Sequence, residues 1–480
     1  MERKPLNSGR DRGGGRGFAR HRGAKWVSRL MRRPFFNNRS LVVGSVSVLL
    51  LLLGLVGSGV AAMPFAPNFG TDGVSETQLP AEDRQLIAEL GQGPLISDLA
   101  VTPSGGLVAA VGSGTENEFF GAASFRARGA LDERFGSAGF VRASIFPSLV
   151  RNTEPQAEGV AVQRDGKIVL VGYRKGVASG TPAPVVMRLL PNGSPDRSFA
   201  QRGLFAPKPD GARADSLRAV AIQPGGRIVA VGVRSERDRT AVQVKRPAGF
   251  VVAYRPDGSV DPGFGRAGRV FFYGPKARYA FTGLLDLSVL ANGKILVVGY
   301  RDNRLLVARL GVDGGLDRSF GGGDGTVSVG LVRQGVCCPE DASLFSLSGG
   351  GSVVLTDGFS PVLMVRLRPN GGFDKRFGRQ GILRSNSQSR PWMRDLAVQG
   401  DGRIVAVGRG EGGFTVMRFR PNGQRDRSFG RRGVATLPRG HTAAATSAAT
   451  LPSGRVVVGG GAQYRRNDRL EYSLLLALLR

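Results

Sequence analysis

Apolar and polar positions alternate in short runs along most of the chain, and the same pattern returns seven times. The clearest copy is a polar turn, an apolar run and a glycine, Asp165-Gly166-Lys167-Ile168-Val169-Leu170-Val171-Gly172. A second apolar run precedes most of these turns. Two short apolar runs around a turn that tolerates positive φ predict a β-hairpin. The other copies begin at Ser104, Gly225, Asn292, Gly350, Asp401 and Ser453.

Two further extended segments complete each unit. A third apolar run, such as Gly249 to Arg255, ends in Pro-Asn-Gly or Pro-Asp-Gly, and a fourth, such as Arg269 to Tyr273, follows. No segment with a 3.6-residue apolar period lies between them. Four short strands in a repeated unit predict the blades of a β-propeller.

A Phe-Gly-x-x-Gly pattern gives an independent count of the units. It occurs seven times at intervals of 52–66 residues, with Ala200 in place of one glycine and one residue inserted before Gly325. We expect each of these phenylalanines to pack as a wedge between blades rather than to bind a ligand. They are Phe69, Phe135, Phe199, Phe264, Phe320, Phe377 and Phe429.

The first and last units are offset in a way that predicts ring closure. The last unit reaches Arg480 without its Phe-Gly segment, and that segment occurs instead at Pro67-Asn68-Phe69-Gly70. Joining the two parts completes one unit and removes free sheet edges. Residues 64–480 are therefore predicted to form an all-β, seven-bladed propeller of four-stranded blades, closed by the N- and C-terminal parts of one repeat.

The combined motifs resemble the bacterial delta-60 repeat family over about residues 64–480. The resemblance is carried by Asp-Gly-Lys-Ile-Val-x-Val-Gly, then x-Arg-Leu-x-Pro-Asn-Gly, then Asp-x-x-Phe-Gly-x-x-Gly. It implies a propeller-type protein of the bacterial exterior, without an assigned activity. Ala200, the insertion near Gly323 and the degenerate copy at Gly350 depart from the pattern in single blades.

The N-terminal region predicts export. Residues 1–40 hold twelve Lys or Arg against Glu2 and Asp11, and residues 41–63 carry no charge. We expect a disordered cytoplasmic tail followed by one hydrophobic helix long enough to span a bilayer. The helix is either a retained signal anchor, which we favour, or a signal peptide cleaved after Ala62. The propeller is then outside the cytoplasm, held at the cell membrane or secreted. Arg32-Arg33 leaves the twin-arginine and Sec routes both open.

Composition changes this picture little. The formal net charge is +30, but the arginines are spread through every repeat, so nucleic acid is not expected as a partner. The adjacent Cys337 and Cys338 have no second pair with which to build a disulfide framework. We expect a monomer that binds an unknown protein or polysaccharide at the cell surface.

Two sets of charged residues recur at fixed places in the repeat. Six units carry an aspartate three residues before the phenylalanine, where turn capping explains it better than calcium binding. Five units carry an arginine in the third strand, which either pairs with that aspartate or joins a cationic ring for an anionic ligand. Pairing is favoured. The aspartates are Asp132, Asp196, Asp261, Asp317, Asp374 and Asp426, and the arginines are Arg126, Arg188, Arg309, Arg366 and Arg418.

Catalytic constellations are scarce in the sequence. The two histidines, His21 and His441, have no triad pattern around them, and no zinc ligand set occurs. We therefore predict no catalytic residues, no cofactor, no metal and no enzymatic activity. The predicted function is a binding or scaffold module at the cell envelope. The alternative is an exported hydrolase or lyase that uses carboxylates on a cell-surface polysaccharide.

Overall fold

The computed structural model describes fifteen stretches of the chain, and all of them lie after residue 64. Val60–Arg480 form one compact unit. The tail predicted at 1–40 and the helix predicted at 41–63 lie outside the described residues. Within the described part, no helix is long and apolar enough to cross a membrane. The described residues are 65–78, 94–113, 120–142, 144, 153–176, 181–207, 213–236, 248–274, 282–302, 304–330, 341–356, 362–385, 391–437, 442–466 and 469–480.

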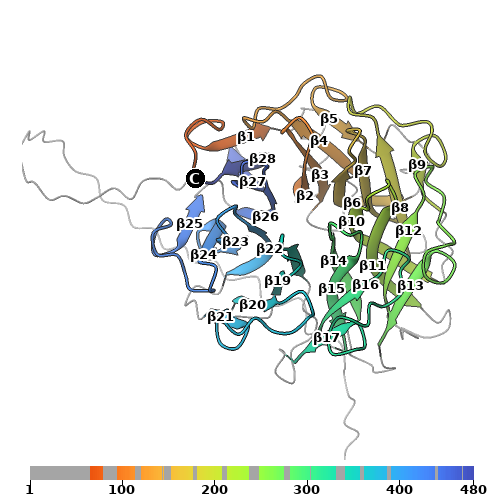
Figure 1. Cartoon of the computed structure of the whole chain (residues 1–480). Coiled ribbons are helices and arrows are strands. Elements are labelled where there is room, and N and C mark those ends of the chain that lie inside the picture. Colours follow the sequence, from red (N-terminus) through yellow and green to blue (C-terminus); the bar gives the residue numbers. More distant parts are fainter. Residues whose placement is uncertain are drawn as a thin grey trace, which may run out of the picture. The chain divides into compact units, whose positions relative to one another are not determined.

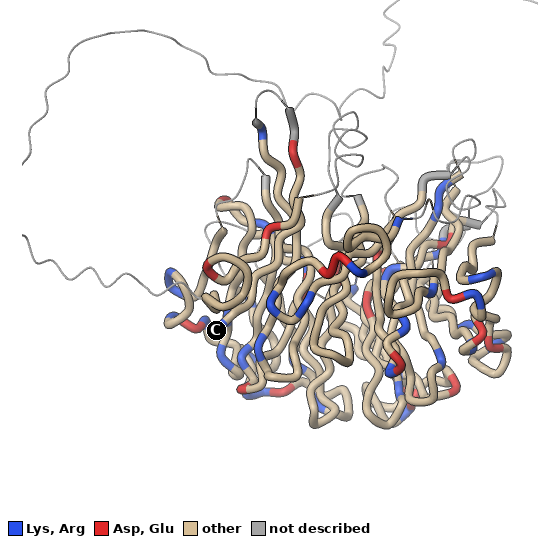
Figure 2. The backbone as a smooth tube through the Cα atoms, turned by 90° about the horizontal axis from the view of Figure 1, so that it is seen from above, with Lys and Arg blue, Asp and Glu red and all other residues tan. Residues whose placement is uncertain are grey.

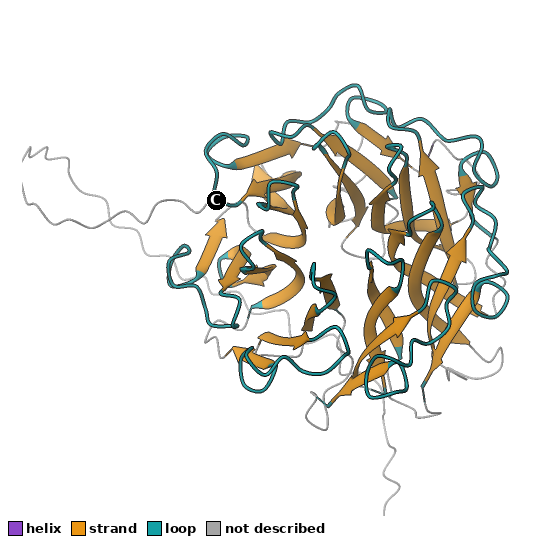
Figure 3. Cartoon of the chain, viewed as in Figure 1, coloured by secondary structure: helices purple, strands orange, loops and turns teal. Residues whose placement is uncertain are grey.

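This compact unit consists of seven antiparallel, four-stranded sheets, which we number as blades 1–7 (Figures 1 and 3). Blade 1 consists of β2 (Pro94–Val101), β3 (Leu107–Ser113), β4 (Gly121–Phe125) and β5 (Phe140–Arg142). Blade 2 consists of β6 (Thr153–Val162), β7 (Ile168–Gly176), β8 (Pro182–Leu189) and β9 (Leu204–Phe205). Blade 3 consists of β10 (Arg213–Ile222), β11 (Ile228–Glu236), β12 (Ala248–Tyr254) and β13 (Arg269–Tyr273).

Blades 4–7 repeat the same order of strands. Blade 4 consists of β14 (Gly283–Val289), β15 (Ile295–Arg301), β16 (Arg304–Leu310) and β17 (Thr326–Val329), and blade 5 of β18 (Ala342–Ser346), β19 (Ser352–Thr356), β20 (Val362–Leu367) and β21 (Ile382–Ser385). Blade 6 consists of β22 (Trp392–Val398), β23 (Ile404–Gly410), β24 (Gly413–Phe419) and β25 (Val434–Leu437). Blade 7 consists of β26 (Thr442–Thr450), β27 (Val456–Arg466), β28 (Arg469–Leu478) and β1 (Val74–Gln78).

The blades form a closed ring around one axis. The first strand of each blade contacts the first strand of the next, from β2 through β26 and back to β2 (Figure 1). The seventh blade takes its outer strand from the other end of the described chain, because β1 pairs with β28 and Val74 lies opposite Ala477. The predicted seven-bladed propeller is confirmed, including the joining of N- and C-terminal parts in one blade.

The hydrophobic core lies between blades rather than within one of them. Each of seven buried clusters in the described residues joins two neighbouring blades; one unites Val171 of blade 2 with Leu217 and Phe250 of blade 3, and another unites Leu99 of blade 1 with Leu476 of blade 7. Both faces of each sheet are therefore buried, which accounts for the nearly continuous apolar runs of the second strands.

The Phe-Gly segment meets the turn of the next blade at six of the seven interfaces in the described part of the chain. The N–H of Gly378, which follows the buried Phe377, donates to the carbonyl of Asn422 in the next blade's Pro-Asn-Gly turn at 2.9 Å. A Cβ added to Gly423 of that turn would lie 2.9 Å from the ring of Phe377. Glycine is therefore needed for contact with the ring as well as for its positive φ of 86°. The phenylalanine and the turn act as one interlock between blades.

Candidate functional site

The repeated arginines lie against the aspartates of their own blades. The charged nitrogen and carboxylate oxygen are closest in the blades with the most buried pairs. The five nitrogen–oxygen distances are 3.5 Å for Arg126–Asp132, 2.8 Å for Arg188–Asp196, 2.7 Å for Arg309–Asp317, 3.2 Å for Arg366–Asp374 and 2.8 Å for Arg418–Asp426.

The sixth repeated aspartate, Asp261, has a different partner. Ala253 stands in the place of the third-strand arginine, because the N–H of Asp261 donates to the carbonyl of Ala253 as that of Asp196 donates to the carbonyl of Arg188. Arg227, just before the second strand, contacts Asp261 at 2.8 Å, and Arg255 lies 3.7 Å from it. The arginines also reach the next blade, as when Arg366 Nη1 donates to the carbonyl of Pro421 at 2.7 Å. Use of these arginines by an anionic ligand stays a prediction.

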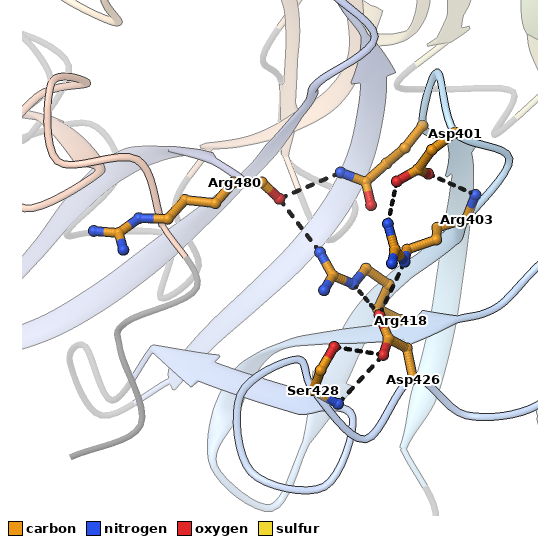
Figure 4. A network of polar contacts seen from close by, with 7 residues as sticks. Asp401, Arg403, Arg418, Asp426, Ser428 and Arg480 are labelled. Carbon is orange, nitrogen blue, oxygen red and sulfur yellow. Dashed lines mark hydrogen bonds and ion pairs between the residues drawn. The ribbon is translucent and has the colours of Figure 1, made fainter. Parts of the chain in front are cut away.

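The same aspartates accept hydrogen bonds from the turn that follows them. Asp196 Oδ1 accepts the backbone N–H of Ser198 at 3.1 Å and its hydroxyl at 2.7 Å. Burial on its own would raise the pKa of Asp196, but the bonds from Ser198 and the charges of Arg188 and Lys167 outweigh it and lower the pKa to about 2. This carboxylate is therefore ionised at neutral pH and holds its turn and arginine together. Figure 4 shows the equivalent network around Asp426 in blade 6.

A second set of carboxylates lies among the innermost strands. Asp98 of β2, Asp286 of β14 and Asp395 of β22 each follow a shift in register between the first two strands of the blade. Such a β-bulge adds a residue to one strand and changes the direction of nearby side chains. The three aspartates take equivalent places in blades 1, 4 and 6.

Each inner aspartate connects its blade to the next one. Asp98 accepts the N–H of Leu99 at 2.7 Å in its own strand and that of Val160 in blade 2 at 2.9 Å. Asp286 accepts the N–H of Leu344 in blade 5 at 2.7 Å, in the same manner. Asp395 accepts the N–H of Ala448 in blade 7 at 2.8 Å. Three interfaces between inner strands are thus bridged by carboxylates.

Two serines extend this set. Ser343 donates to Asp395, and the hydroxyl of Ser447 lies 3.2 Å from an oxygen of Asp395 and 3.3 Å from an oxygen of Asp98. Both serines are buried and occupy the equivalent place in blades 5 and 7. One hydroxyl therefore joins two carboxylates of different blades across the inner ring.

Burial raises the pKa of all three inner aspartates. The pKa of Asp98 rises to about 7, chiefly through burial, while the N–H of Val160 opposes the rise and the charge of Asp395 adds to it. The pKa of Asp286 is raised well above its usual value by burial and by the charges of Asp395 and Asp98. Burial likewise raises the pKa of Asp395. These side chains influence one another electrostatically, and Asp98 is part protonated at neutral pH.

The sequence indicates these three aspartates, although they were not among the predicted site residues. Three inner strands carry an aspartate in an otherwise apolar segment, Asp98-Leu99-Ala100-Val101, Asp286-Leu287-Ser288-Val289 and Asp395-Leu396-Ala397-Val398. A carboxylate repeated in a buried strand needs partners, and that requirement distinguishes it from the turn aspartates. In the described part of the chain, no group of three or more His, Cys, Asp or Glu is placed to hold a metal ion.

A cavity of about 940 Å³ opens where five blades bring together the turns between their first and second strands. We call it the axial cavity. It combines apolar side chains such as Val101 and Ile222 with the amides of Gln163 and Gln223. Gln163 is 8% exposed, and its Oε1 has no hydrogen-bond partner among the described residues. Gln223 Nε2, by contrast, donates to the carbonyl of Gly293 at 2.7 Å.

Comparison with known proteins identifies the repeat type. Residues 163–199, 290–320 and 399–429 match the family described as "Domain of unknown function (DUF5122) beta-propeller". Each match runs from a turn before a second strand to the phenylalanine of the same blade, and so covers the interlock motifs. The protein is therefore a β-propeller repeat protein. No curated protein matches the chain.

Solved structures share the architecture at low similarity. An α-L-arabinanase of Penicillium chrysogenum is 12% identical, with a TM-score of 0.40 over 68% of this chain and 93% of its own. An α-L-arabinofuranosidase of Fusarium graminearum is 10% identical, with a TM-score of 0.39 over 68% and 93%. A gluconolactonase of Xanthomonas campestris is 12% identical, with a TM-score of 0.34 over 72% and 94%.

These similarities correct the prediction that the protein has no enzymatic activity. The three proteins described above are enzymes, so that prediction is contradicted and we withdraw it. It relied on missing histidine and cysteine patterns, which have no bearing on carboxylate chemistry. At these TM-scores, the neighbours identify no reaction, substrate or catalytic residue in this chain.

Proposed function

We propose that this protein is an exported propeller of the delta-60 type that binds a polysaccharide at the cell envelope. The axial cavity supplies the binding site, and residues 41–63 either anchor the protein in the membrane or are removed after Ala62. The motifs of the seven blades support the repeat type, and the uncharged segment after a basic tail supports export. Basic and acidic residues are interspersed over the blades (Figure 2), as suits a general surface more than a nucleic-acid site.

The axial cavity carries this proposal. Its volume of about 940 Å³ has room for several sugar rings, and its wall mixes apolar side chains with amides. Sugars present the same mixture, with C–H faces that pack on apolar groups and hydroxyls that donate and accept hydrogen bonds. Gln163 Oε1 lacks a hydrogen-bond donor among the described residues, and a buried polar group without a partner raises the free energy of the folded protein. A sugar hydroxyl entering the cavity supplies such a donor.

Binding of neutral envelope glycans to the full-length protein tests the proposal. A glycan array identifies the ligand, and titration calorimetry compares the natural protein with Gln163→Leu. We expect at least a tenfold loss of affinity in the variant, since one hydrogen bond is worth about 1 kcal/mol and its loss leaves a polar group unpaired. Gln201→Leu, on an exposed turn, serves as the control. Equal affinity in both variants, or no glycan bound, argues against the axial site.

A second candidate function is cleavage of such a polysaccharide by the inner carboxylates. It is favoured by the hydroxyl of Ser447, which lies within 3.3 Å of both Asp98 and Asp395 and so keeps the two carboxylates close. Acid pairs in glycoside hydrolases are about 5–10 Å apart, and the acid has a raised pKa, as Asp98 has at about 7.

Product analysis separates this candidate from binding alone. The full-length protein is incubated with the glycan found by the array, and released reducing ends are measured. Cleavage that Asp98→Asn and Asp395→Asn each reduce by at least a hundredfold, with binding retained, supports the enzyme. Cleavage unaffected by both substitutions excludes these carboxylates as catalytic groups.

A further inference from the structure

The interface between blades 6 and 7 differs from the other six interfaces. At those six, the residue after the wedge phenylalanine donates its N–H to a carbonyl of the neighbouring turn. At the seventh, the N–H of Gly430 has no such partner among the described residues. The six bonds are Gly70–Arg128, Gly136–Asn192, Ala200–Asp257, Gly265–Asp313, Gly321–Asn370 and Gly378–Asn422.

An arginine at this interface also lacks its usual carboxylate. In four other blades the basic residue directly before the second strand contacts the repeated aspartate. Arg455 occupies the equivalent position in blade 7. The aspartate is replaced there by Ala66, and Arg455 has no acidic partner in the described part of the chain. The four pairs are Lys167–Asp196 at 3.4 Å, Arg227–Asp261 at 2.8 Å, Lys294–Asp317 at 2.8 Å and Arg403–Asp426 at 3.2 Å.

A cavity of about 620 Å³ lies at this interface, and we call it the seventh socket. Figure 4 shows its blade 6 side, where Asp426 is shared by two arginines and the main-chain oxygen of Arg480 accepts from Arg418 at 3.3 Å. Around the socket, the side chains of Arg403, Arg418 and Arg455 stand against those of Asp401 and Asp426. The guanidinium of Arg480 is directed elsewhere and donates to the carbonyl of Phe65 at 2.7 Å.

The socket also contains a buried hydrogen-bond acceptor. Gln399 is 8% exposed and lines the cavity, and its Oε1 has no partner among the described residues. A sulfate ion satisfies the arginines but has no hydrogen to donate to this oxygen. A sugar acid offers both groups, since its carboxylate matches the guanidinium of Arg455 and its hydroxyls are donors.

We propose that the seventh socket binds a uronate residue of an acidic polysaccharide. The carboxylate pairs with Arg455, which has no acidic partner in the described part of the chain, and a ring hydroxyl donates to Gln399. The inference rests on the proposed binding of a polysaccharide, but it uses a cavity separate from the axial one. It assigns the acidic residues of the polymer to the rim between blades 6 and 7.

Calorimetry of the full-length protein with trimers of galacturonate, glucuronate and mannuronate tests this site. We expect at least one acidic trimer to bind, its methyl ester to bind at least tenfold more weakly, and Arg455→Gln to lower the affinity for the acid at least tenfold. Gln399→Leu lowers the affinity for acid and ester alike. Arg376→Gln removes one positive charge from a side chain that is 93% exposed in blade 5, and it leaves the affinity unchanged.

Three results overturn the proposal. They are no binding of any acidic trimer, equal binding of acid and ester, and equal losses in Arg455→Gln and Arg376→Gln, which indicate diffuse attraction to a cationic protein. Gln163→Leu distinguishes the two sites, because it weakens neutral glycans in the axial cavity and leaves the acidic trimer bound. Loss of the acidic trimer in Gln163→Leu, with Arg455→Gln unchanged, assigns that ligand to the axial cavity and also refutes the socket.

Discussion

Aspartate has two opposite roles in this protein, and its surroundings decide which. At the turns, Asp196 is surrounded by N–H, hydroxyl and cationic donors that favour the charged form and lower its pKa to about 2. At the inner strands, Asp98 accepts backbone N–H groups but is buried beside another carboxylate, so its pKa rises to about 7. The turn aspartates therefore strengthen the fold when ionised, while the inner ones strengthen it when protonated.

The pH dependence of stability tests this difference. The pKa of Asp98 is higher in the folded protein than its ordinary value of 3.8, so its contribution to stability is fully present below about pH 4 and is lost as pH rises through 7. Asp98→Asn is expected to reduce the fall in stability between pH 5 and pH 8, measured as the urea midpoint. Part of the fall remains because Asp286 and Asp395 are shifted in the same direction.

Asp317→Asn is the matched control for this experiment. Hydrogen bonds from Lys294 and Ser319 hold the pKa of Asp317 well below its usual value, so this carboxylate is ionised in both folded and unfolded chains from pH 5 to pH 8. Its removal destabilises the protein equally at both pH values. If Asp98→Asn keeps the pH dependence of stability of the natural protein, the pKa of Asp98 is not raised on folding.

At the scale of elements, the strands were predictable from the sequence, while their contacts were not. Turn residues such as Gly166 and Gly423 indicate hairpins because these turns require a positive φ, which glycine readily adopts. The four strands of a blade could therefore be predicted from the sequence. The bulges that place Asp98 and Asp395 among the inner strands depend on register between two strands, which local pattern does not specify. The inner carboxylates were missed for this reason.

The interlock between blades makes a prediction at the same scale. Gly423→Ala is expected to destabilise the protein by about 2–4 kcal/mol, because the new Cβ meets the ring of Phe377 at 2.9 Å and the backbone has a positive φ. The free energy of unfolding in urea measures this loss.

Gly105→Ala separates the two causes. Gly105 has a φ of 81°, close to the 86° of Gly423, but a Cβ there meets nothing within 4 Å. We expect this control to cost only the conformational penalty, about 1–2 kcal/mol. Equal losses in the two variants would mean that the turn does not pack on the neighbouring blade's phenylalanine.

At the scale of the whole molecule, ring closure was predictable because the first and last repeat units are each incomplete and complement one another. Phe69 supplies the segment that the unit ending at Arg480 lacks, and β1 pairs with β28 as that offset requires. The cavities were not predictable, since they arise where turns from several blades converge. The seventh socket brings Gln399 and Arg403 of blade 6 together with Arg455 of blade 7, a combination that appears only once the blades are assembled.

The ring closes between β1 and β28, and an engineered disulfide across that pair is a direct test of the closure. Val74 and Ala477 are opposite residues of antiparallel strands, a separation that a disulfide spans. The two cysteines are introduced into full-length protein carrying Cys337→Ser and Cys338→Ser. The matched control pairs Val74→Cys with Val329→Cys, which lies in blade 4.

Mass spectrometry after mild oxidation gives the result. A closed ring predicts a nearly complete intrachain bond between positions 74 and 477, a melting temperature several degrees above that of the reduced protein, and no such bond in the control. Free thiols, or bonds formed only between molecules, at positions 74 and 477 would contradict the closed ring.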